Sequence, residues 1–394
     1  MRAGLTFLVA GYVLSQFYRA FLAVLSPVLS TEIGASAGDL AISSGLLFLT
    51  FALMQLPVGM ALDRFGPRWT TSILLAGGGA GGALIFAAAQ GPVAVHVAMA
   101  LIGVGCAPVL MASYYIFARI YRPAIFGTLA GAVIGIGSIG NLAGSAPLAM
   151  LAEAIGWRQT LVWLALVTIA VSLAIAVFLR DPPRVTMAPG MGGKLSDLLR
   201  IPGIWAILPL MAVAYAPMAA MRGLWAGPYL ADVFGAGPTG IGRATLIMGL
   251  MMVVGNFAYG PLDRIFGTRK WTVFAGNLLA AASLALLALF PANGFITATI
   301  LLAALGLFGS SFPAIMSHGR AFFPPHMVGR GVTFLNMFGI GGAGLLQFLS
   351  GRVHDSVAET AVQPETPFVG IFLFFLVPLL IGLVVYLFSQ DRTD

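Results

Sequence analysis

The sequence is a succession of apolar stretches, each close to the roughly 20 residues that a helix needs to cross the hydrocarbon of a bilayer. Short polar or glycine-containing segments separate these stretches along nearly the whole chain. Inside lipid, a helix is the element that satisfies its own backbone hydrogen bonds, so the stretches predict an all-α membrane protein. The expected spans are twelve, at residues 7–30, 39–61, 71–90, 94–117, 126–152, 158–179, 203–230, 241–261, 272–291, 294–317, 329–351 and 368–389.

Composition excludes a water-soluble protein. Of the 394 residues, 59% are hydrophobic and 8% are charged, whereas soluble domains carry about 25% charged residues. The net charge of +7 is spread between apolar runs rather than gathered in a basic stripe, so no nucleic-acid partner is expected and the lipid bilayer is the partner of the surface. The run at 7–30 is too long for a cleaved secretory signal and reads as an uncleaved first span.

Lysine and arginine favour one end of the predicted helices, and loops rich in them stay in the cytoplasm. Arg158, Arg243 and Arg352 fall on the opposite side. We therefore expect a multi-pass protein of the cell inner (plasma) membrane with both termini cytoplasmic. The basic residues assigned to the cytoplasmic side are Arg2, Arg64, Arg68, Arg119, Arg122, Arg180, Arg184, Lys194, Arg200, Arg264, Arg269, Lys270, Arg320, Arg330 and Arg392.

One long polar segment divides the predicted helices into six and six. Residues 181–202 combine prolines, glycines and basic residues, which is typical of a linker. We predict an N-terminal six-helix bundle at 1–180, a cytoplasmic linker at 181–202 and a C-terminal six-helix bundle at 203–394. Sliding one half over the other by about 200 residues brings Asp63 and Arg64 onto Asp263 and Arg264, so the halves read as a duplication related by a pseudo-twofold axis.

A specific motif lies at the turn between the second and third predicted helices. The residues from Gly59 to Arg68, GMALDRFGPR, resemble the signature loop of the major facilitator superfamily, Gly-x-x-x-Asp-Arg-x-Gly-x-Arg. The second copy, from Gly260 to Lys270, has one residue fewer before its acid and one more before its second glycine. The resemblance implies the major facilitator fold, with two pseudo-twofold-related bundles, and secondary transport by alternating access.

The same resemblance implies a gate built from the charges at these turns. An acid at a helix end beside guanidinium groups forms a charge cluster, which in this superfamily closes the cytoplasmic side and breaks as the halves rock. The other interpretation is that these charges mark only topology and loop ends. The expected gating residues are Asp63, Arg64, Arg68, Arg119, Asp263, Arg264, Arg269 and Arg320.

Two arginines, Arg19 and Arg222, lie inside predicted spans. A charge at such a position costs roughly 2.5 to 3.5 kcal/mol on insertion scales and faces a partner or a wet cavity. No Asp or Glu lies in the central part of a predicted span, so a transported anion is the natural counter-charge for two guanidinium forks. In the alternative, backbone carbonyls or the outer interface satisfy each arginine.

The stretch from Phe17 to Pro27, with that from Ala52 to Gly59, resembles the anion:cation symporter and organophosphate:phosphate antiporter branches of the superfamily. The resemblance implies that Arg19 binds the substrate anion and that Arg222 assists it. The symporters usually place an acid before this arginine, whereas the chain has Tyr18. Exchange against a counter-anion, or coupling to another ion, therefore stays open.

Other polar or aromatic side chains on the expected spans are candidates for the substrate site, although hydrogen bonds between helices explain such residues equally well. His318 is a candidate for a coupling proton because histidine titrates near neutral pH, but it also sits near the cytoplasmic interface. The substrate-binding candidates beside the two arginines are Tyr12, Gln16, Tyr215, Tyr115, Trp225 and Asn336.

Competing functions have weaker patterns. Met248 and Met252, with Met218 and Met221, have the spacing of a copper(I) pathway, and drug efflux or a transporter-like membrane sensor are further alternatives. Nothing predicts an enzyme, a cofactor or a metal centre, because Cys106 is the single cysteine and no catalytic arrangement is evident. The expected partners are a small anionic substrate with a coupling proton or counter-anion, and a monomer is expected.

Overall fold

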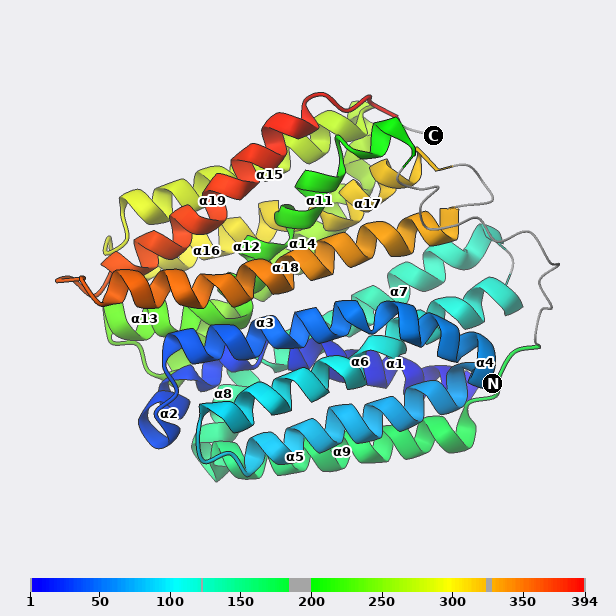
Figure 1. Cartoon of the computed structure of the whole chain (residues 1–394), viewed down its shortest axis with the longest axis horizontal. Helices are drawn as coiled ribbons and strands as arrows, with labels where there is room; N and C mark the ends of the chain where they lie inside the picture. Colours follow the sequence, from blue (N-terminus) through cyan, green and yellow to red (C-terminus); the bar gives the residue numbers. More distant parts are fainter. Residues whose placement is uncertain (1, 122, 184–199, 324–327, 393–394) are drawn as a thin grey trace. The chain divides into compact units, whose positions relative to one another are not determined.

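The computed structural model describes residues 2–121, 123–183, 200–323 and 328–392, and every regular element in those ranges is a helix (Figure 1). The all-α prediction is confirmed. The chain forms two compact units, which are described separately: unit 1 is Met1–Val185 with Gly237–Arg243, and unit 2 is Thr186–Ala236 with Ala244–Asp394. Most of the expected linker, residues 184–199, lies outside the described residues, and the division into 1–180, 181–202 and 203–394 stays a prediction.

Unit 1 holds the first six expected spans. Its first span bends by 50° between two helices, and its fifth bends by 41°. Gly66, with φ 82° and ψ 165°, breaks one long helix so that its start completes the second span and its remainder begins the third. The elements are α1 (Arg2–Tyr18), α2 (Leu22–Ile33), α3 (Ala37–Leu53), α4 (Gln55–Leu74), η1 (Leu75–Ala80), α5 (Gly81–Ala87), α6 (Pro92–Ile120), α7 (Pro123–Ala143), α8 (Ala146–Ile155) and α9 (Trp157–Phe178).

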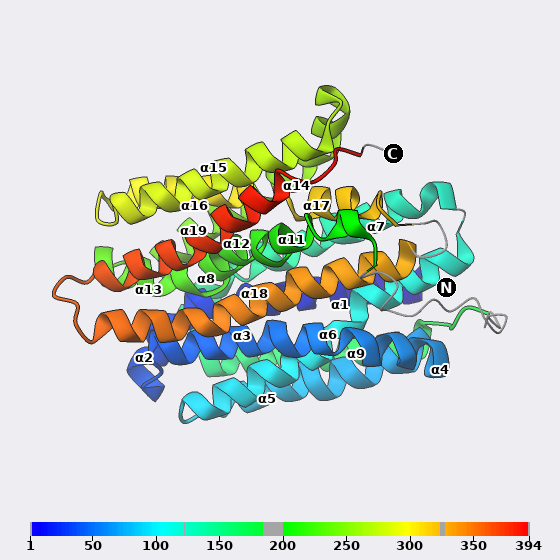
Figure 2. The same ribbon diagram turned by 45° about the horizontal axis from the view of Figure 1, so that its top comes forward.

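Unit 2 holds the other six spans, with α11, α18 and α19 packed side by side (Figure 2). Its first span is irregular because Pro217 has no N–H to donate to the preceding turn, and α11 ends at Ala214. The elements are η2 (Pro202–Ile204), α11 (Leu208–Ala214), α12 (Ala216–Ala220), η3 (Met221–Trp225), α13 (Ala226–Phe234), α14 (Pro238–Phe266), α15 (Arg269–Leu289), α16 (Phe295–Gly309), α17 (Phe312–Arg320), α18 (Val328–Ala358) and α19 (Thr366–Tyr386).

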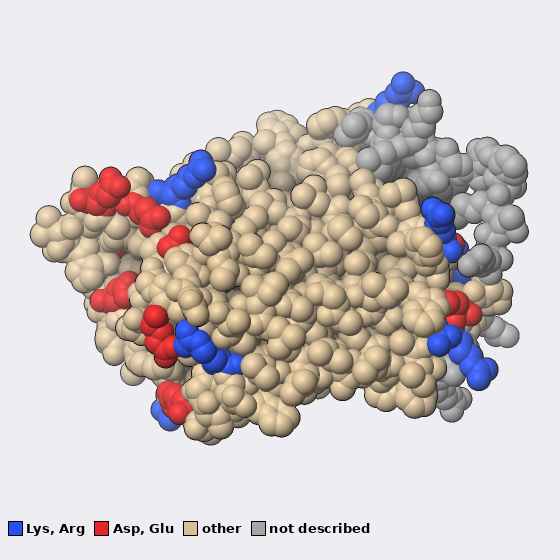
Figure 3. All heavy atoms as spheres, turned by 60° about the horizontal axis from the view of Figure 1, so that its bottom comes forward, with Lys and Arg blue, Asp and Glu red and all other residues tan. Residues whose placement is uncertain are grey.

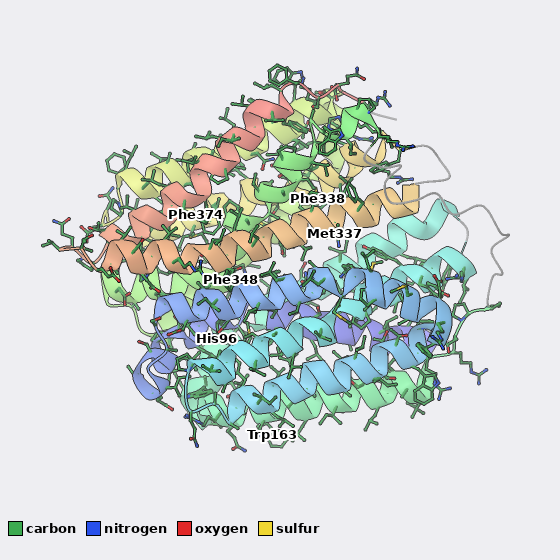
Figure 4. All side chains as sticks on the ribbon, viewed as in Figure 1. His96, Trp163, Met337, Phe338, Phe348 and Phe374 are labelled. Atoms are coloured by element: carbon green, nitrogen blue, oxygen red, sulfur yellow. The ribbon has the colours of Figure 1, made fainter. Side chains whose placement is uncertain are left out.

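The helices expose apolar side chains where a soluble protein would expose polar ones. Trp163 on α9 is 55% exposed and points away from its helix (Figure 4). On the face drawn in Figure 3, charged side chains gather at the two ends and leave an uncharged band between them. This distribution fits a protein whose sides contact hydrocarbon and whose ends contact water.

Glycines set the close packing of two helix pairs. A Cβ added at Gly140 on α7 would overlap the backbone carbonyl oxygen of Val13 on α1, and one added at Gly342 on α18 would overlap that of Ala212 on α11. The backbones of these pairs therefore touch, as small residues allow in membrane proteins.

We expect Gly140→Ala to destabilise the protein, because backbone atoms cannot yield to the added methyl group. Overpacking of this kind costs about 1–3 kcal/mol, which exceeds the gain of about 0.5–1 kcal/mol for alanine over glycine in a helix. Gly59→Ala is the matched control, since nothing lies within 4 Å of its added Cβ. Thermal unfolding in detergent should show a lower midpoint for Gly140→Ala alone, and equal midpoints would contradict the packing argument.

Candidate functional site

Arg19 lies in the break between α1 and α2, and not within a continuous helix as its spacing suggested. Its guanidinium carbon sits 4.3 Å from the centroid of the Phe51 ring on α3. The side chain is half-buried, and its Nε is buried without a hydrogen bond to any described residue. Among the described carboxylates, none forms an ion pair with Arg19.

The residues that precede Arg19 face other helices. A Cβ on Gly137 of α7 would overlap the ring of Tyr12 and would lie 3.4 Å from Cγ of Gln16. Arg19, in the helix break, lies over Phe51 on α3 instead. The substrate role of Tyr12 and Gln16 stays a prediction.

Tyr18 does not take the place of the symporters' acid. It is fully buried, and its hydroxyl lies 2.9 Å from the Thr168 hydroxyl oxygen on α9. Thr168 in turn donates to the carbonyl oxygen of Leu164. These bonds tie α1 to α9 and leave the guanidinium beside it without a carboxylate at this position.

Arg222 lies in the π-helical segment η3 and is 3% exposed. A Cβ on Gly249 of α14 would lie 2.8 Å from its Nη2 atom and 2.9 Å from its Nε atom. The guanidinium therefore occupies space that a side chain at position 249 would take. It is a charged group held within the protein interior of unit 2.

The remaining substrate candidates have different surroundings. Trp225 is fully buried, and its indole N–H donates to Ser350 Oγ at 2.9 Å, which fits a contact between η3 and α18. The Tyr215 ring lies 5.2 Å from that of Phe312. Asn336 is half-buried on α18. Their contact with substrate stays a prediction.

Tyr115 belongs with the first expected charge cluster. The guanidinium carbon of Arg119 lies 3.5 Å from the centroid of the Tyr115 ring, and its Nη2 forms an ion pair with Asp63 Oδ1 at 3.5 Å. Asp63 has a relative exposure of 62% and the arginine 16%. The structure thus brings together Asp63 and Arg119, two of the expected gating residues, from α4 and α6.

Arg68 has another partner, which the sequence analysis missed. Its backbone N–H donates to Asp181 Oδ1 at 2.8 Å, and its Nε donates to the Ala176 carbonyl oxygen at 2.5 Å. A Cβ at Gly66 would lie 2.5 Å from the Asp181 carboxyl carbon, so glycine makes room for this acid. Arg64 lies over the ring of its neighbour Phe65 at 5.2 Å.

Unit 2 repeats this arrangement at Asp391. The backbone N–H groups of Arg269 and Lys270 donate to Asp391 Oδ1 at 3.2 and 3.0 Å, the Thr268 hydroxyl donates to Oδ2, and Lys270 Nζ donates to the Leu387 carbonyl oxygen at 2.6 Å. An acid after the last helix thus caps the third span in each unit. The signal in the sequence was an aspartate directly after the sixth and twelfth spans.

The other gating candidates of unit 2 stay predictions. The side chains of Asp263 and Arg264 lie outside the described residues. Arg269 contributes its backbone to the Asp391 cap, and Arg320 is exposed at the end of α17. The motif glycine Gly267 has φ 65°, which places the turn before Arg269 in the left-handed region that favours glycine.

His318 uses both ring nitrogens in the interior. Nε2 lies 2.9 Å from the Gln390 carbonyl oxygen and Nδ1 lies 2.6 Å from the Tyr386 hydroxyl oxygen. Because a carbonyl oxygen only accepts, Nε2 donates and Nδ1 accepts from tyrosine in the neutral ring. The contacts join α17 to the last residue of α19 and to the segment after it, and a coupling role for His318 stays a prediction.

Two clusters lie at the ends of spans that the orientation rule places outside. Trp157 Nε1 donates to Glu32 at 2.9 Å and Arg158 pairs with the same carboxylate, so these two residues join α9 to α2. His96 on α6, marked in Figure 4, lies 2.7 Å from Ser43 Oγ and 3.8 Å from Asp39. Sequence reasoning singled out neither Glu32 nor His96.

Three methionines of the copper alternative contact neighbouring helices, and that alternative stays a prediction. Met218 Sδ accepts a hydrogen bond from Ser310 at 3.5 Å, and a Cβ at Gly306 would touch Met248 and Met252. In the described part of the chain, no group of three or more His, Cys, Asp or Glu residues is placed to hold a metal ion.

Comparison with known proteins identifies a matching family and two similar sequences. The sequence profile of the Major Facilitator Superfamily matches residues 8–226 and 218–394. A protein of Agrobacterium vitis named "Putative tartrate transporter" is 23% identical over 391 residues, covering 90% of this chain and 85% of that protein. The "Uncharacterized transporter YybO" of Bacillus subtilis (strain 168) is 24% identical over 178 residues, which are 44% of this chain and 39% of that protein.

Solved structures show the same fold. A bacterial homologue of the human lysosomal transporter Spinster, inward-facing and occupied, has a TM-score of 0.70 at 20% identity and covers 98% of this chain and 96% of its own. A mutant of the nucleoside transporter NupG has a TM-score of 0.75 at 13% identity and covers 98% of this chain and 99% of its own.

The Asp391 cap gives a pH-dependent prediction. Partial desolvation opposes ionisation, but the hydrogen bonds from Thr268 and from the backbones of Lys270 and Arg269 hold the pKa of Asp391 below its ordinary value. The ionised carboxylate therefore stabilises the fold at neutral pH, and this contribution is lost as the pH falls through the lowered pKa. Asp391→Asn should cost about 0.5 kcal/mol at neutral pH, the size of a charge at a helix N-terminus.

Thermal midpoints across a pH series would test this cap. The difference between wild type and Asp391→Asn should shrink in acid. Glu359→Gln, an exposed residue after α18, is the control and should show no such trend. A difference that persists unchanged at acid pH would contradict the ionic role of Asp391.

Proposed function

The chain belongs to the Major Facilitator Superfamily and is a membrane transporter rather than an enzyme, and on that premise we propose that it is a secondary transporter of small organic anions. It moves a carboxylate or a phosphate ester across the inner membrane by alternating access. Arg19 is the principal anion ligand, and Arg222 is the second.

Arg19 carries this proposal. Its guanidinium is half-buried in a membrane span, one of its donors is buried without a hydrogen bond to a described residue, and no described carboxylate pairs with it. Buried donors are nearly always hydrogen-bonded, so an orphaned one points to a missing ligand. An anionic substrate supplies both the charge and the acceptor oxygens that a guanidinium fork takes bidentately.

The backbone around both arginines supports the same proposal. Arg19 lies in a break between two helices and Arg222 in a π-helical segment, and the two occupy the first span of their units. In transporters with internal repeats, interrupted helices at corresponding positions of the two halves mark the binding site. A segment that binds no ligand would satisfy its backbone hydrogen bonds best as a regular helix.

The name of one relative agrees with this substrate class. The Agrobacterium vitis protein is named for tartrate, a dicarboxylate, and the alignment spans most of both chains. A carboxylate is the planar acceptor that fits a guanidinium group. Tartrate is therefore the first probe to use.

The charge pair of Asp63 and Arg119 has a role in the proposed cycle. It joins α4 to α6 at the end of unit 1 where the basic loops gather, and we assign it to the cytoplasmic gate. An exposed pair of this kind contributes about 0–1 kcal/mol, so it can open and close without a large barrier.

The proposal for Arg19 predicts that Arg19→Ala and Arg19→Lys abolish anion uptake into proteoliposomes while membrane insertion stays intact. Lysine keeps the charge but loses the planar fork. A thermal-shift screen of wild type against tartrate, other carboxylates, sugar phosphates and inorganic phosphate selects the anion for uptake. Full transport by both variants, or no stabilisation by any of these anions, would reject the assignment.

Arg352→Ala is the matched control for Arg19. Its guanidinium also lies over an aromatic ring, 5.8 Å from the centroid of Phe348, but it is exposed at the far end of α18. Uptake by this variant should equal that of wild type.

The proposed orientation predicts cytoplasmic termini, because the Lys and Arg residues gather on that side. A fluorescent protein fused after residue 394 should fluoresce in cells. Alkaline phosphatase inserted near Gln363, between α18 and α19, should be active because it reaches the outside. The reverse pattern would refute the orientation.

A further inference from the structure

Each unit places one residue of its second span against the arginine of its first span. In unit 1 this residue is Phe51 on α3, and in unit 2 it is Gly249 on α14. Arg19 thus lies beside a large aromatic ring, whereas Arg222 lies beside a position with no side chain.

The side chains of the two arginines are buried to different extents. Arg19 is half-buried against the ring, 4.3 Å from its centroid. Arg222 is 3% exposed, and its Nη2 atom lies 2.8 Å from where a Cβ of residue 249 would be. The Phe51 ring fills the space beside the Arg19 guanidinium, whereas no side chain at position 249 takes the space beside Arg222.

We propose that Phe51 and Gly249 set how deeply the two guanidinium groups are buried, so that Arg19, the principal anion ligand, is the more exposed and Arg222, the second ligand, is the more buried. Stacking on Phe51 uses one face of the guanidinium plane and leaves the N–H groups at its edge free to point at a carboxylate or phosphate. Phe51 is then a positioning residue for the anion ligand. The part of this inference that concerns anions rests on the proposed function, while the part that concerns depth does not.

Two substitutions should change the burial of the arginines in opposite directions. Phe51→Ala opens a space beside Arg19, so its guanidinium should sink. Gly249→Ala adds a methyl group within 3 Å of the Arg222 guanidinium, and the flexible end of that side chain must shift. Alanine is also a better helix former than glycine, so α14 itself should remain intact.

The measurement is labelling of the purified protein with hydroxyphenylglyoxal, which modifies accessible guanidinium groups, followed by peptide mass spectrometry. In wild type, Arg19 should react severalfold faster than Arg222. Phe51→Ala should slow the labelling of Arg19 severalfold, and Gly249→Ala should speed that of Arg222 severalfold. Phe51→Tyr, which keeps the ring, and Gly77→Ala, whose added Cβ meets nothing within 4 Å, are the controls.

Ligand binding separates this inference from the proposed function. Tartrate or inorganic phosphate should protect Arg19 from labelling, and Phe51→Ala should weaken this protection about fivefold, the equivalent of one cation–π contact. Unchanged labelling of both arginines in the two variants would overturn the depth assignment. Shifted labelling without protection by either anion would keep the depth assignment and reject the anion function.

Discussion

The cost of placing a guanidinium group inside a membrane governs how the first span of each unit is built. A charge at mid-membrane survives where something compensates for the loss of water. Around Arg19 the compensation comes from the π face of Phe51 and, in our proposal, from the cargo. Arg222 is enclosed within unit 2, in η3 beside Gly249.

The N-terminus of the third span in each unit also needs compensating partners. The first N–H groups of a helix lack partners inside the helix, and a negative charge there is favourable. Asp181 and Asp391 meet this need at the third span of their units, and each comes from the segment after the last span. Two residues of the signature loop therefore have separate partners: Asp63 pairs with Arg119 on α6, while the Arg68 backbone N–H donates to Asp181.

Several residues singled out in the sequence proved to be engaged within the protein. Trp225 gives its indole N–H to Ser350, Tyr115 lies under Arg119, and His318 bridges Tyr386 and Gln390. Polar atoms in an apolar interior pair with whatever donor or acceptor is nearest. Spacing along one helix does not reveal that neighbour, and this is why the candidate site was only partly predictable.

The sequence by itself determined the membrane class, the all-α fold, the spans and the two intramembrane arginines, because apolar run length and buried charge are local properties of the chain. The tertiary structure decided what the arginines touch. Arg19, in the break after Tyr18, lies over Phe51, and Arg222 occupies the space that a side chain at position 249 would take. Contacts between residues far apart in sequence depend on helix packing and on backbone irregularity. The spacing of residues along a single helix predicts neither of them.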